Sequence, residues 1–401
     1  MERRDPTTTV RGLCQRVGEQ FDALPDRALK RVEVALFGVV VSAVVVAGYL
    51  QGRLQLVFPI PSVLGGDAVT MLQATMACLT LSGLFGISAV VLLGQLRGDG
   101  VPQFPVTGPT VTAVVPVHED AAVLHRSVES LLDSHYRDIE VVIVAEPGDE
   151  ASIERGRSLA SHDRVELLVN DEYPGKKAGA INYAAEATTS DLFAVFDADE
   201  RVDEQFVSAA VGRIEENDAD VVQGRTIPEP DGLVGVVAYY ESVVLGDLSQ
   251  RLLTVVTDFT VAASRTVVMT RSAFETADGY DPEMLTEDYA FAFDCYQSGL
   301  DVVEQFAYAS TIEAAHTVRD WWGQRKRWMT GYVQVLHHLL GRSVGRLVGD
   351  TGSHPHRDLL SPVICASSVF GNLFMLSLVS KAAVLVSYGQ GRWLTIPAFT
   401  L

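Results

Sequence analysis

Residues 190–200 read SDLFAVFDADE, and this stretch decides the fold. Its run of β-branched and aromatic residues, Leu192–Phe196, predicts a buried strand. Asp197 and Asp199 follow at the carboxyl end of the strand, where open α/β sheets bind ligands. Residues i and i+2 of an extended chain point to the same side, so both carboxylates are predicted to converge on one hard cation. The alternative is an acidic, solvated turn.

Other segments continue the same alternation of strand and helix. Buried strands are predicted at residues 111–115, 141–145 and 165–169, and residues 121–134 have helical spacing. This order predicts a parallel sheet covered by helices. No GxGxxG follows the first strand, which argues against a dinucleotide-dependent redox enzyme.

The composition indicates a chain that lies partly in a membrane. Apolar residues make up 48% of the 401 residues, which is high for a soluble protein. The net charge of −20, with few lysines, is interpreted as a halophilic adaptation to a high-salt cytoplasm. A nucleic-acid partner is not expected, because phosphate binding needs a basic surface. The scattered cysteines are interpreted as buried thiols in a reducing compartment: Cys14, Cys78, Cys295 and Cys365.

Uncharged apolar segments flank the predicted sheet. After a basic segment at 1–31, residues 32–97 contain the runs 34–50 and 74–93, which predict a transmembrane hairpin. Because only Arg53 lies between the two runs, the positive-inside rule places both ends of the hairpin in the cytoplasm. We therefore expect a multi-pass protein of the cell membrane, with its main domain, residues 98–316, in the cytoplasm.

The carboxyl-terminal part also has membrane-like patterns. Residues 317–345 predict an amphipathic helix in which Trp321 and Trp328 share a face beside basic side chains. This helix is expected to lie along the cytoplasmic leaflet, and a core helix of the soluble domain is the alternative. A third apolar segment, 359–388, is either one long tilted span or a broken pair, and 389–401 form a tail.

Short motifs occur in a characteristic order. They are PVHE at 116–119, KKAGAIN at 176–182, DAD at 197–199, TED at 286–288 and QRKRW at 324–328. Together they resemble the membrane-integrated family 2 glycosyltransferases, the group that includes cellulose, chitin and hyaluronan synthases and ceramide glucosyltransferase. The resemblance covers residues 110–330. It implies a GT-A (Rossmann-like) fold, a nucleotide-diphosphate sugar donor (a UDP-sugar above others), Mg²⁺ or Mn²⁺, and inversion at the anomeric carbon.

The acidic residues have physical roles in such a reaction. A divalent ion between Asp197, Asp199 and the phosphates neutralises the charge that develops on the leaving diphosphate. Asp288 is the candidate general base for the acceptor hydroxyl, and Glu287 beside it is expected to raise its proton affinity by like-charge repulsion. The alternative for this pair is an acidic helix amino terminus after Thr286.

The resemblance also implies donor and acceptor contacts. Arg327 is expected to bind the diphosphate through two N–H groups of its guanidinium fork. Trp328, with Gln324, is expected to bind an acceptor sugar. Taken alone, an Arg-Trp pair in a basic amphipathic helix would more often be a membrane anchor. Lys177, or Lys176 before it, is expected to reach the nucleotide.

Some positions depart from the family pattern. Glu119 lies where the family contacts the base, and either Glu146 or Asp149 stands in for the Asp pair that many relatives use for the nucleoside. Glu200 replaces a histidine found in several synthases and is either a third metal ligand or a surface residue. Residues 260–264 replace the FFCG-type segment of cellulose synthases. Three histidines are expected to be packed or interfacial rather than ligands: His316, His337 and His338.

The expected function is transfer of a sugar to a growing polysaccharide at the cytoplasmic membrane face. A lipid acceptor, such as a polyprenyl phosphate or a glycolipid, is the alternative. Membrane lipids are expected partners in both cases. A catalytically silent membrane scaffold is a hypothesis of a different class, and the intact set Asp197, Asp199, Asp288, Arg327 and Trp328 argues against it.

Overall fold

The computed structural model describes residues 104–173, 176–229, 232–348 and 354–369, together with six separate positions between Gly83 and Leu93. The chain divides into two compact units. One unit is Leu92–Gly331, and the other combines Met1–Val91 with Tyr332–Leu401. The domain predicted at residues 98–316 lies within the unit Leu92–Gly331.

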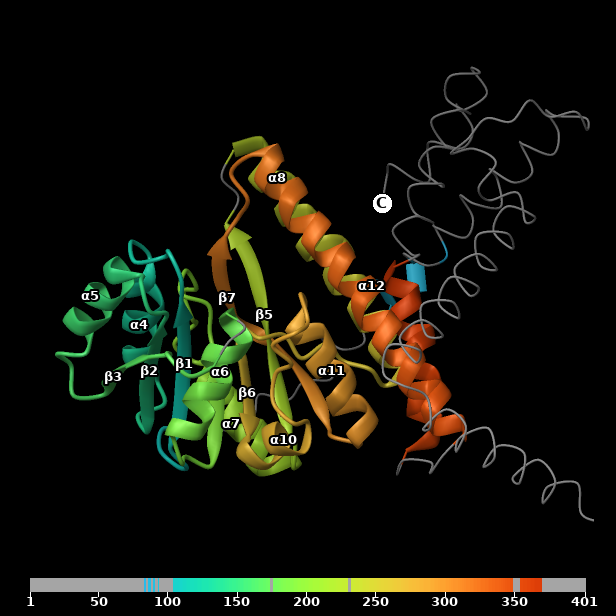
Figure 1. The fold of residues 1–401 in the computed structure, drawn as a ribbon, viewed down its shortest axis with the longest axis horizontal. Coiled ribbons are helices and arrows are strands. Elements are labelled where there is room, and N and C mark those ends of the chain that lie inside the picture. Colours follow the sequence, from blue (N-terminus) through green and yellow to red (C-terminus); the bar gives the residue numbers. More distant parts are fainter. Residues whose placement is uncertain are drawn as a thin grey trace, which may run out of the picture. The chain divides into compact units, whose positions relative to one another are not determined.

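A seven-stranded sheet is the centre of the unit Leu92–Gly331 (Figure 1). Its strand order is β3-β2-β1-β4-β6-β5-β7. The strands are β1 (Val111–Val117), β2 (Ile139–Ala145), β3 (Val165–Val169), β4 (Leu192–Val195), β5 (Val221–Glu229), β6 (Val267–Thr270) and β7 (Val302–Glu313). The strands predicted from the sequence match β1 to β4 to within a few residues.

Helices connect and cover these strands. They are α4 (Leu124–Leu132), α5 (Glu150–Leu159), α6 (Lys176–Ala187), α7 (Phe206–Asn217), α8 (Gly232–Tyr240), α9 (Asp247–Thr257), α10 (Arg271–Thr276), α11 (Glu287–Ser298) and α12 (Val318–Val348). A π-helix, η1 (Glu241–Gly246), joins α8 to α9. Helix α12 confirms the helix predicted at 317–345.

The parallel pairing predicted for the strands at residues 111–196 is confirmed, and the strands that follow make the whole sheet mixed. β1 to β4 pair in parallel, but β6 is antiparallel to both β4 and β5. After β5 the chain passes through α8, η1 and α9. It then enters β6 from the end of the sheet at which the carboxyl end of β5 lies (Figure 1). It therefore returns in the opposite direction. This reversal places the turn before β6, residues 263–266, beside the carboxyl ends of the parallel strands.

The core lies between the parallel strands and their helices. Residues of β1, β2 and β4 are buried almost without exception. Phe196, directly after β4, packs edge-on against Phe206 of α7, with ring centroids 6.2 Å apart. Burying such aromatic side chains contributes about 1.5–3 kcal/mol each, which fixes the end of β4 where the acidic motif begins.

The predicted membrane segments fall mostly outside the described residues. The run 34–50 lies outside the described residues, the run 74–93 is described only at isolated positions, and the segment 359–388 only as far as residue 369, where residues 355–369 are helical. Within the part of the chain that is described, no helix combines the length and the apolar character needed to cross a bilayer. Two of the predicted buried thiols, Cys295 and Cys365, are buried and free, and Cys14 and Cys78 lie outside the described residues.

Gly224 of β5 is expected to be required for close packing against Phe206 and Thr266. A Cβ atom at this position would lie 2.4 Å from Phe206 Cε2 and 2.5 Å from Thr266 Cγ2. Gly224→Ala should therefore lower the free energy of unfolding by about 1–3 kcal/mol, measured by thermal and chemical unfolding of the full chain. Gly323→Ala in α12 is the matched control, because a Cβ there meets no atom within 4 Å. Equal unfolding midpoints for Gly224→Ala and the wild type would contradict this expectation.

Candidate active site

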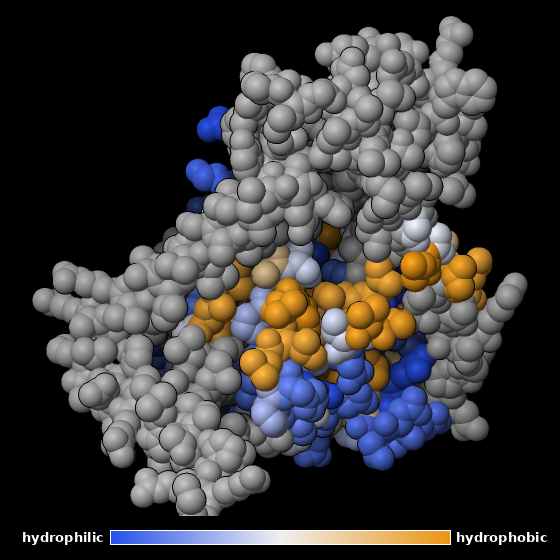
Figure 2. Space-filling model, turned by 90° about the vertical axis from the view of Figure 1, so that its right-hand side faces the viewer, coloured by the Kyte–Doolittle hydropathy of each residue, from blue (hydrophilic) through white to orange (hydrophobic). Residues whose placement is uncertain are grey.

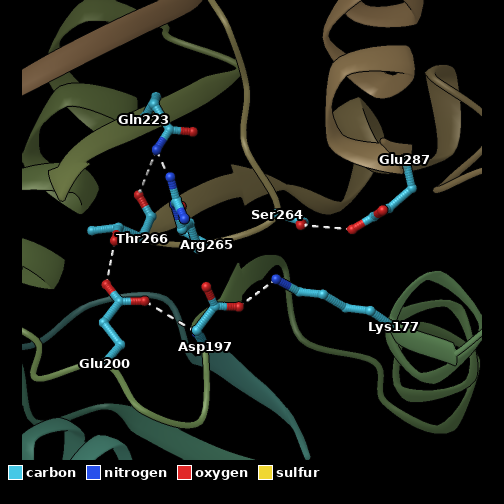
Figure 3. A network of polar contacts seen from close by, with 8 residues as sticks. All are labelled: Lys177, Asp197, Glu200, Gln223, Ser264, Arg265, Thr266 and Glu287. Carbon is cyan, nitrogen blue, oxygen red and sulfur yellow. Dashed lines mark hydrogen bonds and ion pairs between the residues drawn. The ribbon is translucent and has the colours of Figure 1, made fainter. Parts of the chain in front are cut away.

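Asp197 and Lys177 form an ion pair just beyond the carboxyl end of β4 (Figure 3). Lys177 lies in the first turn of α6. The Asp197 side chain is 25% exposed and the Lys177 side chain 30%. Burial acts to raise the pKa of Asp197, but the positive charges of Lys177, Arg265 and Arg327 outweigh burial and hold the pKa below its usual range. Asp197 is therefore an ionised carboxylate at the centre of a group of cations.

Asp199 lies beside Asp197 by a different geometry from the one predicted. Strand β4 ends at Val195, and residues 197–200 form a turn in which the Glu200 N–H donates to the Asp197 carbonyl at 3.2 Å. The extended alternation assumed from the sequence is therefore wrong here. Burial and then the charge of Asp197 raise the pKa of Asp199, while the Glu313 N–H donates to Asp199 Oδ2 at 3.3 Å. The turn still brings the two carboxylates together.

The acidic pair Glu287–Asp288 opens helix α11, after Thr286 at the N-cap. The pair is therefore an acidic helix amino terminus, as one of its two interpretations predicted, and the role of Asp288 as general base stays a prediction. The negative charges of both residues act on Lys177, so they share its surroundings. The pKa that is raised here is that of Glu287, by burial and then by Asp288. The expected like-charge repulsion thus shows itself on Glu287.

Two sequence-distant contacts hold α11 in this place. The side chain of Asn182, in the KKAGAIN motif, donates to the Tyr280 carbonyl at 2.7 Å and accepts from the Tyr280 N–H at 3.0 Å. Gly331 of α12 approaches Thr286 so closely that a Cβ atom would lie 2.4 Å from Thr286 Cγ2. Helices α6 and α12 are therefore both in contact with residues 280–286, which lead into α11.

The turn before β6 is hydrogen-bonded to two acidic side chains, Glu287 and Glu200. The Ser264 hydroxyl donates to Glu287 Oε1 at 3.0 Å, and the Thr266 hydroxyl donates to Glu200 (Figure 3). Thr266 has φ 44°, a left-handed conformation that is unfavourable for a β-branched residue. The side chain of Gln223 fixes the turn, because its amide accepts from the Ala263 N–H at 2.6 Å and donates to the Arg265 carbonyl at 3.1 Å.

Glu200 is fully buried, so it is not the surface residue that was one of its two predicted roles. One oxygen accepts from the Thr266 hydroxyl and the other from the Asp197 N–H at 3.1 Å. Both oxygens thus have partners within the protein. Burial, followed by the charge of Asp197, raises the pKa of Glu200 to about 7. Glu200 fixes the backbone of Asp197 relative to the turn before β6.

The predicted nucleoside contacts lie at the carboxyl ends of β1 and β2. His118 Nδ1 is 3.2 Å from Glu146 Oε2. Asp149 is the N-cap of α5 and accepts from the Ser152 N–H and from the Glu119 N–H, at 3.2 and 2.7 Å. Asp149 therefore has a structural role, while Glu146 is paired with His118. The Glu119 side chain is exposed.

The QRKRW motif lies on α12 and is held by Glu241 of the π-helix η1. Arg325 donates to both oxygens of Glu241, at 2.8 and 2.5 Å, and Trp321 Nε1 donates to it at 3.0 Å. The guanidinium of Arg325 also lies 4.0 Å from the ring centroid of Trp328, a cation–π contact. Gln324 accepts from Arg325 at 3.2 Å. These contacts fix Trp328, whereas the Arg327 side chain is exposed.

The structure thus brings together most of the predicted residues and adds others. Lys177, Asp197, Asp199, Glu287 and Asp288 lie together, and the charge of Arg327 reaches them. Glu119 and Glu146 lie apart from this group, at the ends of β1 and β2. The sequence analysis did not identify three contributors: Asp120, Glu241 and Arg265. Their signals were weak, because isolated charges in loops and helices have no characteristic spacing.

The carboxylates fit a divalent cation held jointly with a phosphate group. Among the described residues, no three His, Cys, Asp or Glu side chains converge to form a metal centre by themselves. Mg²⁺ commonly binds through only one or two carboxylates together with water and substrate phosphates. Burial and the neighbouring Asp197 raise the pKa of both Asp199 and Asp120, so an added positive charge would be favourable at this position.

Two family models match the chain. One, described as glycosyl transferase family 2, matches residues 112–267, and the other, described as glycosyl transferase family group 2, matches residues 192–401, just over half of the chain. Among curated proteins, the chain is 22% identical to the probable glycosyltransferase YdaM of Bacillus subtilis over 242 residues, 58% of each protein. It is 27% identical to the glycosyltransferase GlyG of Streptococcus pneumoniae over 124 residues, 30% of this chain and 41% of GlyG. The chain thus spans about half the length of these relatives.

A solved structure has a similar fold. It is the mannosyltransferase PcManGT from Pyrobaculum calidifontis, in complex with GDP-Man and Mn²⁺. The two structures have a TM-score of 0.51 and 16% sequence identity, over 79% of this chain and 87% of PcManGT. The family matches and this likeness confirm the expected GT-A fold.

The raised pKa of Glu200 is expected to make the stability of the fold depend on pH. The folded state holds this proton up to a pH of about 7, whereas the unfolded chain releases it near the ordinary pKa of 4.5. The stabilisation is therefore complete below the unfolded pKa and is lost as the pH rises through the folded pKa.

Glu200→Gln, which mimics the protonated side chain, should remove this dependence. Between about pH 5 and about pH 8 the wild type should lose thermal stability relative to the variant, as followed by circular dichroism at a series of pH values. Parallel pH profiles for the two proteins would show that Glu200 titrates in the ordinary range.

Proposed function

Because the chain belongs to glycosyl transferase family group 2, we propose that it transfers a sugar, with inversion, from a nucleotide-diphosphate sugar to an acceptor at a membrane surface. The observation that carries this proposal is the ion pair of Asp197 with Lys177, on which residues from four separate motifs converge. Such a concentration of mutually dependent charges is typical of catalytic sites.

The donor diphosphate is proposed to bind beside Asp197 and Asp199. Arg327 is exposed and its positive charge acts on Asp197, so it is available to bind phosphate oxygens with two of its guanidinium nitrogens. Asp197 and Asp199 would hold Mg²⁺ or Mn²⁺, which would neutralise negative charge on the leaving diphosphate. The Mn²⁺ and GDP-Man in the PcManGT complex support this kind of donor site. A UDP-sugar remains our first choice of donor.

Asp288 is the proposed general base. Its carboxylate takes the proton from the acceptor hydroxyl, while that oxygen forms a bond to the anomeric carbon and the bond from this carbon to the diphosphate breaks. The raised pKa of Glu287 makes it the better proton holder of the pair, which leaves Asp288 as the one available to accept the proton. One oxygen of the Glu287 carboxyl already accepts the hydrogen bond from the Ser264 hydroxyl.

The proposed acceptor is a growing polysaccharide. Trp328 is held in place by the Arg325–Glu241 contacts and offers an apolar face on which a sugar ring can stack. A fixed aromatic ring suits an acceptor that shifts by one sugar after each transfer. A polyprenyl phosphate or glycolipid acceptor is the alternative, since α12 also carries exposed Trp322, at 65% relative exposure.

A location at the cytoplasmic face of the cell membrane is also part of the proposal. The uncharged runs at 34–50 and 74–93 support it. Apolar side chains gather on the described surface that faces the viewer in Figure 2. Within the unit Leu92–Gly331, exposed apolar side chains occur on α8 and on α12: Val236, Val237, Tyr240 and Trp322. Apolar surface of this kind favours contact with lipid. The acidic composition supports a high-salt cytoplasm as the setting.

Asp288→Asn should abolish transfer without abolishing donor binding. The loss of the general base is expected to lower the turnover number by about 10²–10⁴-fold, measured with radiolabelled nucleotide sugars. Donor binding should persist as a ligand-dependent rise in the unfolding temperature. Asp278→Asn, the same chemical change at an exposed residue, is the matched control. Full turnover in Asp288→Asn would rule out its role as base, and a wild type that neither binds nor turns over any donor would favour the silent scaffold.

Product analysis should separate the two proposed acceptors. We expect a ladder of products that differ by one sugar when the full chain is incubated with donor and a defined oligosaccharide primer. Mass spectrometry of the products is the measurement, and a polyprenyl phosphate is offered in a parallel reaction. A single sugar added to the lipid, with no ladder on the primer, would overturn the polysaccharide proposal in favour of the lipid acceptor.

A further inference from the structure

Arg265 is a half-buried cation in the site whose guanidinium group has no role in holding the fold. Among the described residues, none accepts a hydrogen bond from it or forms a salt bridge with it, while its backbone carbonyl accepts from Gln223 at 3.1 Å. A guanidinium carries five N–H donors and is seldom left without acceptors in a partly buried position. The side chain is therefore available to a ligand.

Arg271, six positions further along the chain, shows how a structural arginine is satisfied. Its Nε donates to the Ser190 carbonyl at 2.7 Å, its NH1 to the Ala185 carbonyl at 2.7 Å and its NH2 to the Thr188 hydroxyl at 3.1 Å. All three nitrogens thus bind the protein itself. Among the described residues, none makes such a contact with the Arg265 guanidinium.

The turn before β6 is built to present Arg265. Ser264 on one side is bonded to Glu287, and Thr266 on the other is bonded to Glu200, so both neighbours are tied to acidic residues of the site (Figure 3). Thr266 keeps a left-handed φ of 44°, which is strained for a β-branched residue. Strain of this kind persists where the surrounding contacts enforce it, and it is concentrated at ligand sites.

The negative charges of the site and of a bound diphosphate favour a further cation beside Lys177. Lys177 is already paired with Asp197, while Glu287 and Asp288 add negative charge nearby. A diphosphate brings further negative charge, and two cations that act on Asp197 have no salt bridge to a described residue: Arg265 and the exposed Arg327. Both act on Asp197, although one comes from the turn before β6 and the other from α12.

We propose that Arg265 is a donor-binding residue that holds the diphosphate of the nucleotide sugar together with Arg327, one guanidinium from each side. This inference rests on the proposed function, since it assigns a further contact to the same donor. Arginine suits this role because its planar fork binds two phosphate oxygens at once. The contact would persist on the leaving diphosphate, where negative charge develops during transfer.

The test compares nucleoside diphosphates with monophosphates. Isothermal titration calorimetry of the full chain, at one fixed Mg²⁺ concentration, measures the affinities for UDP, GDP, UMP and GMP. Arg265→Ala should weaken binding of the preferred diphosphate by about 10-fold or more, as expected for a charge-assisted hydrogen bond, and leave the matching monophosphate within about 2-fold of the wild type. Arg157→Ala, the same change at an exposed residue of α5, is the matched control and should bind both like the wild type.

Two results would overturn the assignment. Unchanged diphosphate affinity in Arg265→Ala would show that Arg265 does not contact the phosphates, and an equal loss for diphosphate and monophosphate would show a structural effect on the whole pocket. Arg265→Gln, which keeps the length and polarity of the side chain, serves as a second variant if Arg265→Ala does not fold. A wild type that binds neither UDP nor GDP would overturn the proposed function itself, which is a separate outcome.

Discussion

A carboxylate that is partly removed from water needs an opposite charge beside it, and at Asp197 this requirement organises the whole site. The partner is Lys177, at the start of α6, and the pair forms at the end of β4. Without the cation, burial would favour the protonated acid. With it, Asp197 remains ionised, and the charges of Glu287 and Asp288 on α11 then act on Lys177 in turn. Each group thus depends on the others for its charge state.

The antiparallel strand β6 is what completes this arrangement. If the sheet were parallel throughout, the turn before β6 would lie at the amino ends of the strands, far from the carboxyl ends of β1 and β4. Instead the turn reaches Glu200 through Thr266 and Glu287 through Ser264. Gln223 of β5 holds the backbone of this turn and Glu200 accepts from the Thr266 hydroxyl, so contacts from both residues maintain the strained conformation of Thr266. The sheet therefore positions chemical groups as well as forming a core.

Helix α12 contributes one fixed and one open side chain. Arg325 and Trp321 both bind Glu241, whose position depends on the π-helix that interrupts the α8–α9 segment. π-Helical turns are frequent at functional sites. Arg325 thereby fixes Trp328, whereas Arg327, two residues away, keeps an exposed guanidinium. The close approach of Gly331 to Thr286 sets the distance between α12 and the acidic helix α11.

The sequence by itself determined the local features of this protein. Runs of buried residues predicted β1 to β4, and the motifs around Lys177, Asp197, Asp288 and Trp328 identified the main chemical groups, because both signals depend on residues close together in the chain. The direction of β6, the roles of Glu200 and Glu241 and the open guanidinium of Arg265 were decided only by the tertiary structure. Each of these depends on partners tens of residues away, and no local pattern records which distant strand or helix will supply the opposite charge or the hydrogen-bond acceptor.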